Sequence, residues 1–243
     1  MSGHSKWSNI KHRKGAQDAK RAKVFTRLGK ELTIAAKEAG GDPNFNPRLR
    51  LAIDKAKAAN MPKDNLERAI KKGTGELEGV DYMEIRYEGY GPEGTAFIVE
   101  VITDNKNRSA SEVRAAFSRN NGNLGTDGAV AWMFQRKGEI IVSAEGIDAE
   151  EFMMAALEAG ADDVIEEDGE FTVLTEQSQC NLVTEELKKL GYKIEESEVS
   201  MVPDNKVSIT DLETAKKVMD LYDVLDDLDD VNDVYSNFDI SEE

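Results

Sequence analysis

Histidine and cysteine are almost missing from this chain, and their scarcity excludes several kinds of chemistry. Cys180 is the single cysteine among 243 residues, so no disulfide can form within the chain, which fits a reducing compartment. Both histidines, His4 and His12, lie near the start, so a Cys/His zinc site cannot be assembled. A Ser-His-Asp or Cys-His apparatus would need that N-terminal arm to fold into a pocket. We therefore expect no metal, no cofactor and no enzymatic activity, although the 48 acidic residues leave carboxylate chemistry formally open.

Long apolar runs are also missing. No segment approaches the roughly 18–20 apolar residues that a membrane-spanning helix needs. The N-terminus has no apolar segment typical of a secretory signal, and Ser2 rather than glycine follows Met1, which argues against myristoylation. Together with the single cysteine, these features predict a cytoplasmic protein without a membrane partner.

What the chain has in abundance is charge, and the two signs are unevenly divided. Residues 1–75 carry 18 Lys/Arg and 7 Asp/Glu, a net charge of +11, whereas residues 76–243 carry 13 Lys/Arg and 41 Asp/Glu, a net charge of −28. The overall charge of −17 conceals this division. A basic region can release counterions from a phosphate backbone, while the acidic remainder is repelled by it. The distribution predicts a nucleic-acid partner for the N-terminal region without distinguishing DNA from RNA.

Helical periodicity dominates the basic region. Apolar side chains recur at helical spacing over residues 16–39, and two glycines then provide a stop. An asparagine followed by proline at the first helical position predicts a second helix over 46–59. A third helix is expected over 62–73, where Gly73 ends it. The pattern predicts a three-helix unit with an arm, residues 2–14, in front of it.

Basic side chains on the arm and on the polar face of the first helix are the candidate nucleic-acid contacts. Lysine and arginine neutralise phosphates, and an aromatic ring among them can stack on a base for about 1–3 kcal/mol. The alternative is that each basic side chain belongs to a solvated helix face and that Trp7 packs back on the helices. The charge of the whole region favours the nucleic-acid interpretation. The predicted binding residues are Lys6, Trp7, Lys11, His12, Arg13, Lys14, Lys20, Arg21, Lys23, Arg27 and Lys30.

Beyond the basic region the periodicity changes to strands and short helices. Two strands joined by a turn, over 82–103, precede a helix over 109–120, a glycine-rich loop and a strand at 130–134. Residues 139–201 then follow the order βαββαβ, which is the ferredoxin-like unit. A helix and a strand over 211–237 have no strand partners of their own. We expect them to complete the interrupted unit as ββαβ…αβ.

The predicted fold class is therefore α+β, with a three-helix N-terminal domain followed by two ferredoxin-like α/β domains, one inserted into the other. The head, residues 1–79, is the basic helical domain with its flexible N-terminal arm. The discontinuous domain combines residues 80–137 with 204–243, and the inserted domain is residues 138–203.

Four motifs could be taken for ligand sites, and in each a structural interpretation is favoured. Residues 89–94 match G-x-G-x-x-G, but they lead to a strand instead of a helix, so a hairpin turn is expected. The glycine-rich loop 122–128 lacks the Lys and Ser/Thr of a P-loop. Residues 226–230 lack the glycine and glutamate of a calcium loop, which predicts a solvated helix end. Residues 104–108 favour a turn and a helix cap, and a binding role there stays open.

Longer motifs spread over the chain are specific enough to indicate a family. They are Gly3-His4-Ser5-Lys6-Trp7, Ile10-Lys11-His12-Arg13-Lys14, Asn60-Met61-Pro62, Asp64-Asn65, Arg68-Ala69-Ile70-Lys71-Lys72-Gly73, Tyr87-Glu88-Gly89-Tyr90-Gly91-Pro92, Thr103-Asp104-Asn105, Asn107-Arg108, Glu112-Val113-Arg114 and Val234-Tyr235-Ser236-Asn237-Phe238-Asp239. With these motifs the chain resembles the YebC/PmpR family of bacterial and organellar regulatory proteins. The resemblance covers essentially the whole chain, with 139–203 similar in pattern more than in letters. Glu93 and Ala129 depart from the usual glycine and serine, and Ala129 weakens any argument for a hydroxyl contact there.

The resemblance implies a three-domain cytoplasmic protein, a helical domain with two ferredoxin-like domains, and no catalysis. Bacterial members are described as probable transcriptional regulators that bind promoter DNA. Mitochondrial members act as translational activators, and bacterial members have been linked to ribosomes stalled in proline-rich sequences. The implied partners are therefore rRNA or tRNA, with the ribosome, or promoter DNA.

The residues favour RNA or the ribosome, because no helix-turn-helix signature or dimer element is apparent. A basic three-helix unit could nevertheless sit on a DNA duplex. Two other classes stay open. One is a small-molecule-sensing or enzymatic protein with a ligand cleft between the α/β domains, with candidates at Gly125 and at 104–108. The other is an adaptor whose acidic body docks basic partners. The sequence does not indicate whether the protein is a monomer or an oligomer.

Overall fold

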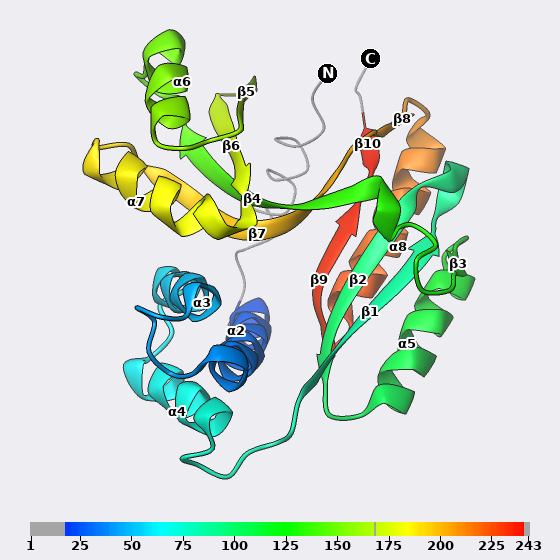
Figure 1. Cartoon of the computed structure of the whole chain (residues 1–243). Coiled ribbons are helices and arrows are strands. Elements are labelled where there is room, and N and C mark those ends of the chain that lie inside the picture. The colour runs from blue at the N-terminus through cyan, green and yellow to red at the C-terminus, as the bar shows by residue number, and fades with distance from the viewer. Residues whose placement is uncertain (1–17, 168, 241–243) are drawn as a thin grey trace.

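The computed structural model describes residues 18–167 and 169–240, with side chains described from residue 22 onward. The head contains α2 (Asp18–Ala39), α3 (Pro47–Ala58) and α4 (Lys63–Thr74), so its three helices are confirmed (Figure 1). The caps follow from local sequence. Asn46 accepts a hydrogen bond from the Leu49 amide at 3.0 Å, proline occupies the first turn of α3, and Gly40 ends α2 with φ 89°.

Gly73 does not end its helix, and the prediction was wrong here. Helix α4 continues to Thr74, and Gly75, with φ 84°, forms its left-handed cap. A Cβ on Gly73 would lie 2.3 Å from the Thr33 carbonyl oxygen and 2.8 Å from the Ala36 Cβ, so this glycine lets α4 approach α2 closely. The buried core of the head is rich in alanine, as such close packing requires, and consists of Leu32, Ala35, Ala36, Leu49, Ala52, Ala56, Met61 and Ala69.

The discontinuous domain is a four-stranded antiparallel sheet with two helices packed on one face. Its strands lie in the order β3-β1-β2-β9, so a strand from the C-terminal end pairs with β2, as the interrupted pattern predicted. Side chains alternate along β2, where Phe97 and Val99 face the helices and Ile98 faces the opposite side. The elements are β1 (Met83–Tyr90), β2 (Ala96–Thr103), α5 (Lys106–Arg119), β3 (Asn123–Leu124), α8 (Leu212–Asp227) and β9 (Val231–Ser236).

Two local predictions in this domain are confirmed. Residues 89–94 form a hairpin turn, in which η1 (Pro92–Gly94) joins β1 to β2. Asn105 caps α5 by accepting a hydrogen bond from the Arg108 amide at 3.0 Å, which starts the helix three residues earlier than the periodicity indicated.

The inserted domain has the predicted βαββαβ order and the ferredoxin-like sheet. Its strands lie in the order β5-β6-β4-β7, all antiparallel, with α6 and α7 packed on the sheet. Phe152 stacks on Phe171 with ring centroids 4.3 Å apart at the centre of this core. The elements are β4 (Phe134–Ser143), α6 (Ala149–Glu158), β5 (Asp163–Glu167), β6 (Glu170–Glu176), η3 (Gln177–Gln179), α7 (Cys180–Lys189) and β7 (Ile194–Pro203).

Strand β4 is continuous where two separate strands were predicted. Residues around Trp132 form η2 (Ala131–Met133), and β4 then runs unbroken through Gly138. A Cβ on Gly138 would lie 2.2 Å from the Thr175 hydroxyl oxygen and 2.6 Å from the Cys180 Cβ, so this glycine serves close packing and does not mark a strand end. A short parallel pair, β8 (Val207–Ile209) with β10 (Phe238–Ile240), was also not predicted.

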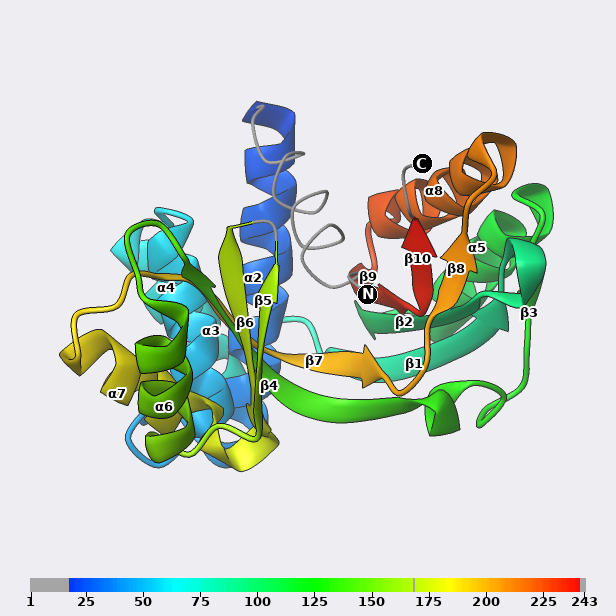
Figure 2. The same cartoon turned by 90° about the horizontal axis from the view of Figure 1, so that it is seen from above.

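The fold class is confirmed, and the long strands β4 and β7 run side by side from the inserted domain toward the discontinuous domain (Figures 1 and 2). The exact domain boundaries stay predictions, and the boundary between residues 137 and 138 falls within β4. A shared apolar cluster joins these two domains, with Phe134 and Met201 meeting Ile98 and Tyr235. Among the described helices, none has the length and apolar character needed to cross a membrane.

Candidate nucleic-acid interface

The structure describes side chains for three of the eleven predicted binding residues. Lys20 and Arg21 lie in the first turn of α2, and their side chains lie outside the described part. Lys23, Arg27 and Lys30 follow at helical spacing on the same helix. Six predicted residues belong to the arm and lie outside the described residues, so their role stays a prediction. These six are Lys6, Trp7, Lys11, His12, Arg13 and Lys14.

The three described cations contact the acidic segment, defined here as residues 226–230, at the junction of α8 and β9. Lys23 Nζ lies 3.4 Å from an Asp227 carboxylate oxygen, and Arg27 lies 3.1 Å from an Asp226 carboxylate oxygen. Both side chains also donate to the backbone carbonyl of the same partner.

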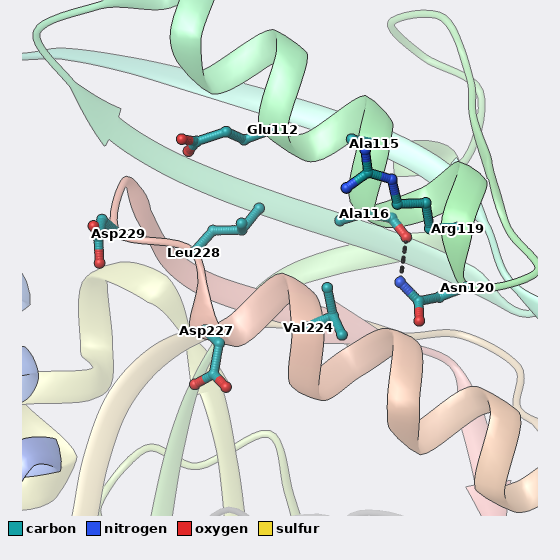
Figure 3. A pocket seen from close by; sticks show the side chains of 9 residues that line it. All are labelled: Glu112, Ala115, Ala116, Arg119, Asn120, Val224, Asp227, Leu228 and Asp229. Atoms are coloured by element: carbon teal, nitrogen blue, oxygen red, sulfur yellow. Dashed lines mark hydrogen bonds between the residues drawn. The ribbon is translucent and has the colours of Figure 1, made fainter.

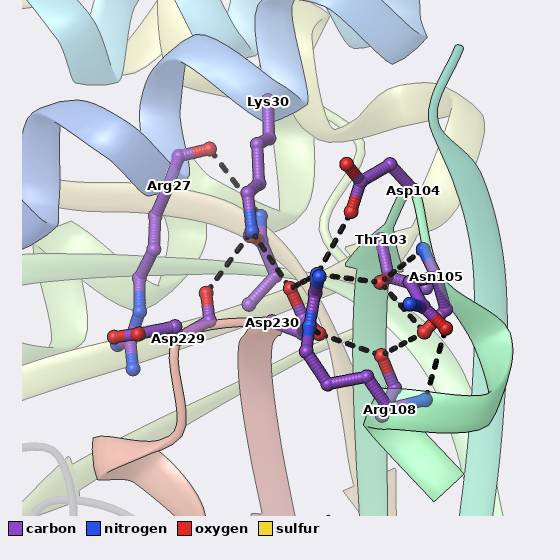
Figure 4. A network of polar contacts seen from close by, with 10 residues as sticks. Arg27, Lys30, Thr103, Asp104, Asn105, Arg108, Asp229 and Asp230 are labelled. Carbon is purple, nitrogen blue, oxygen red and sulfur yellow. Dashed lines mark hydrogen bonds and ion pairs between the residues drawn. The ribbon is translucent and has the colours of Figure 1, made fainter. Parts of the chain in front are cut away.

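Lys30 extends these contacts into the interior (Figure 4). It donates to the Asp229 carbonyl oxygen at 3.0 Å and lies 3.6 Å from the Asp230 carboxylate, with Lys30 and Asp230 only 8% and 5% exposed. The prediction of a solvated helix end was therefore wrong for Asp230, whereas Asp227 and Asp229 are exposed as predicted. The buried charge of Asp230 is accommodated because Lys30 of another domain lies beside it.

Asp230 is the centre of a wider polar network. Arg108 donates to both of its carboxylate oxygens, at 3.0 and 2.9 Å, and the Ser109 hydroxyl donates at 2.7 Å (Figure 4). Burial alone would raise the pKa of Asp230, but the hydrogen bonds from Arg108 and Ser109 hold it below its usual value. The turn at 104–108 thus holds an internal carboxylate, and Arg108 also pairs with Asp104 at 2.8 Å.

Four exposed cations elsewhere on the head were not named individually as binding residues. Arg68, Lys71 and Lys72 lie at i, i+3 and i+4 on α4, and therefore share one face, and Lys57 lies on α3. In the part of the chain that the structure describes, none of the four forms an ion pair, in contrast to the cations of α2. The sequence signal was the Arg68–Lys72 run, which carried the family resemblance but was not treated as a binding surface.

The end of the glycine-rich loop and the residues after it bind the buried carboxylate of Glu88 in β1. Glu88, 2% exposed, accepts hydrogen bonds from the amides of Gly128, Val130 and Ala131 at 2.7, 2.9 and 2.6 Å. Burial would raise the pKa of Glu88, but these donors together lower it. The Gly125 amide donates to the Glu88 carbonyl oxygen at 2.8 Å. These amides are already engaged, which argues against an anion site in the loop.

An open pocket of about 310 Å³ lies between α5 and α8 (Figure 3). Its wall combines one cation, Arg119, with acidic side chains and a few apolar ones, and the Asn120 side chain is held by a 2.7 Å hydrogen bond to the Ala116 carbonyl oxygen. It coincides with neither of the two predicted ligand sites. Within residues 18–167 and 169–240, no group of His, Cys, Asp or Glu is placed to hold a metal. The lining residues are Glu112, Ala115, Ala116, Arg119, Asn120, Val224, Asp227, Leu228 and Asp229.

Comparison with known proteins identifies the family. The sequence profile for the TACO1/YebC N-terminal domain matches residues 5–76, and the profile for the TACO1/YebC second and third domain matches residues 82–238. The chain belongs to the TACO1/YebC family. The resemblance noted from the motifs is thereby confirmed for both the head and the TACO1/YebC α/β domains.

Relatives of this TACO1/YebC chain carry regulatory names. A "Probable transcriptional regulatory protein" of Fusobacterium nucleatum is 73% identical over 243 residues, covering 100% of this chain and 98% of the relative. One of the same name from Geobacter sulfurreducens is 58% identical over 243 residues, with the same coverage of 100% and 98%. A crystal structure of a conserved hypothetical protein from Aquifex aeolicus superposes with a TM-score of 0.85 at 47% identity, covering 93% of each chain.

Proposed function

We propose that this TACO1/YebC chain is a non-enzymatic regulator of gene expression that binds nucleic acid through its basic head. The observation that carries the proposal is the separation of charge, with +11 over residues 1–75 and −28 over the remainder. A polyanion is attracted to one end of such a molecule and repelled by the other, so the head determines both affinity and orientation. The regulatory names of the relatives support this role.

The surface proposed for binding has two parts. The arm with Lys20 and Arg21 supplies cations and the Trp7 ring, which can stack on an unpaired base. The exposed face of α4, with Arg68, Lys71 and Lys72, supplies cations that have no ion-pair partner among the described residues. These side chains can neutralise phosphates without first losing an internal contact.

RNA, in the ribosome or in a transcript, is the proposed target, and promoter DNA is the alternative. We favour RNA because a short basic arm with one aromatic ring suits unpaired bases, and because the sequence has neither a helix-turn-helix signature nor a dimer element. Ultraviolet cross-linking in growing cells, with recovery of both RNA and DNA, tests the choice. Discrete rRNA or tRNA positions would support the RNA proposal, whereas enrichment of promoter DNA would contradict it.

A charge-matched pair of variants tests whether the head binds at all. Arg68→Gln/Lys71→Gln/Lys72→Gln removes three positive charges from α4, and Lys106→Gln/Arg119→Gln/Lys216→Gln removes three from α5 and α8. We expect the head variant to weaken binding to a labelled RNA and to reduce the salt dependence of log K by about 2–3, since each phosphate contact contributes about 0.7–0.9. Equal effects in the two variants, or full affinity after deletion of residues 1–20, would contradict the proposal.

A further inference from the structure

The head is held to the two α/β domains by contacts of different chemistry. Toward the inserted domain the contact is apolar at its centre, because Leu51 of α3 belongs to the same buried cluster as Ile140 and Phe152. Polar contacts surround it, with Lys55 lying 2.6 Å from Glu198. Such a contact is insensitive to salt at its centre.

Toward the discontinuous domain the contact of α2 is made by charges. Lys23, Arg27 and Lys30 meet the acidic segment, and in the described part of the chain no hydrophobic cluster contains residues of both α2 and α8 or β9. The pairs of Lys23 and Arg27 are partly open to solvent, and such pairs are individually weak and are screened by salt. The Lys30–Asp230 pair is buried. This contact can therefore open while the apolar contact of α3 persists.

The acidic segment occupies three of the cations that were predicted to bind nucleic acid. Carboxylates spaced along residues 226–230 present to α2 the same kind of charge that a phosphate backbone would present. We propose that the acidic segment is an internal competitor of nucleic acid, covering the basic face of α2 until a phosphate backbone displaces it. This inference rests on the proposed function and adds a regulated state to it.

The displaced segment keeps its most buried charge satisfied. When Lys30 leaves, Asp230 retains both hydrogen bonds from Arg108 and the one from Ser109. Asp226 and Asp227 lie at the surface end of α8, where water can replace their partners. Opening therefore leaves no buried carboxylate without a partner, which would otherwise make it prohibitively costly.

The closed contact is also incompletely paired on the side of the head. Arg27 Nε and Asn232 Oδ1 are buried without a hydrogen-bond partner, although the Asn232 amide nitrogen lies 3.5 Å from the Arg27 carbonyl oxygen. A buried donor without an acceptor weakens the closed arrangement. A phosphate oxygen could accept from this guanidinium nitrogen once α2 is exposed, so exchange of partners improves the pairing of Arg27.

The first test measures the contact between α2 and the acidic segment directly, in the absence of nucleic acid. A carbodiimide forms an amide between an amine and a carboxylate in contact, so in the full chain it should couple Lys23 to Asp227, and Lys55 to Glu198 as an internal control. We expect the Lys23–Asp227 product, quantified by peptide mapping, to fall at least threefold between about 0.05 M and 1 M NaCl, where the Debye length shortens to about 3 Å. The Lys55–Glu198 product should change less. A salt-independent Lys23–Asp227 product would overturn the inference.

The second test measures competition with a charge-matched pair of variants. Asp226→Asn/Asp227→Asn removes two carboxylates that pair with α2, and Asp220→Asn/Asp239→Asn removes two carboxylates of the same domain outside the acidic segment, which make no ion pair with the described side chains of α2. The probes are a labelled 20-nucleotide single-stranded RNA and a duplex DNA of the same sequence.

We expect Asp226→Asn/Asp227→Asn to bind at least one probe about three- to tenfold more tightly than both the unmodified chain and the control variant, as the loss of two partly exposed ion pairs predicts. Equal affinity of the two variants would overturn the competition. If no protein binds either probe, the proposed function and the competition fail together, while a salt-dependent Lys23–Asp227 product would still establish the opening of the contact. The two failures are thus distinguishable.

Discussion

At the scale of single residues, Glu88 shows how one carboxylate can order a loop that resembles an anion site. It lies in β1 and collects three amides from residues 128–131. The carbonyl oxygen of Ala129, which directly follows the glycine-rich loop, accepts from both the Tyr90 hydroxyl and the Trp132 indole, at 3.1 and 3.0 Å. Residues 128–131 are therefore held by two side chains of β1, Glu88 and Tyr90, and by Trp132, which follows them.

Replacing Glu88 tests this role. In Glu88→Gln one carboxylate oxygen becomes an NH2 group, which would face either the Gly128 amide or the amides of Val130 and Ala131 and leave that donor without its acceptor. We expect the free energy of unfolding to fall by about 2 kcal/mol, the usual cost of a lost hydrogen bond to a charged group. Urea unfolding at pH 7 measures this change, and the exposed Glu93→Gln is the matched control, expected to lie within about 0.5 kcal/mol of the unmodified chain.

The pH dependence separates charge from packing in the same variant. Because the folded pKa of Glu88 lies below the usual 4.5, its stabilising contribution is complete above pH 4.5 and is lost as pH falls through the folded value. The difference between the unmodified chain and Glu88→Gln should therefore shrink at acid pH. A difference that stays constant from pH 7 to the acid transition would show that shape, and not the carboxylate charge, holds the loop.

At the scale of elements, helix caps could be predicted from the sequence and close helix contacts could not. A cap depends on two or three neighbouring residues, which is why Asn46 and Gly40 were assigned correctly. Gly73 was assigned as a helix end, because a glycine needed for packing looks the same in sequence as one that ends an element. Gly138, between the strands predicted at 130–134 and from residue 139, also serves close packing. Their actual partners, Thr33 and Thr175, lie 40 and 37 positions away along the chain.

Two helix glycines in the head give a matched test of that distinction. A Cβ at Gly29 of α2 meets no atom within 4 Å, so Gly29→Ala should stabilise the protein by up to about 1 kcal/mol through helix propensity. Gly73→Ala gains the same propensity, but its Cβ would lie 2.3 Å from a backbone carbonyl oxygen, and we expect a net loss of about 1–3 kcal/mol. Thermal unfolding of both variants measures these changes. Equal shifts in the same direction would show that α4 can move away from α2.

At the scale of the whole molecule, the sequence predicted where the charges lie but not that they meet. Its charge division and its three-domain fold class were accessible from composition, periodicity and motifs. The pairing of Lys23 and Arg27 with a segment about 200 residues later depends on how the head packs against the rest, which no local pattern encodes. A basic helix face can therefore be counted as a binding surface only after the internal partners of its cations are known. Here the basic face of α4 is more exposed than the basic face of α2.

The position of the head should depend on one apolar residue when salt has weakened its charged contacts. Leu51 is 9% exposed and packs into the core of the inserted domain, so Leu51→Ala should lower the free energy of unfolding by about 2–3 kcal/mol. The control Leu212→Ala, at an 85% exposed site, should change it by less than about 0.5 kcal/mol.

Hydrogen exchange followed by mass spectrometry then locates the effect. In about 1 M NaCl we expect Leu51→Ala to speed exchange most in the facing helices α3 and α7, because both the charged and the apolar contacts of the head are then weakened. Unchanged exchange in α3 and α7 would mean that the polar contacts, Lys55 with Glu198 and the 3.0 Å hydrogen bond from the Asn181 amide to the Pro47 carbonyl oxygen, suffice to hold the head in place.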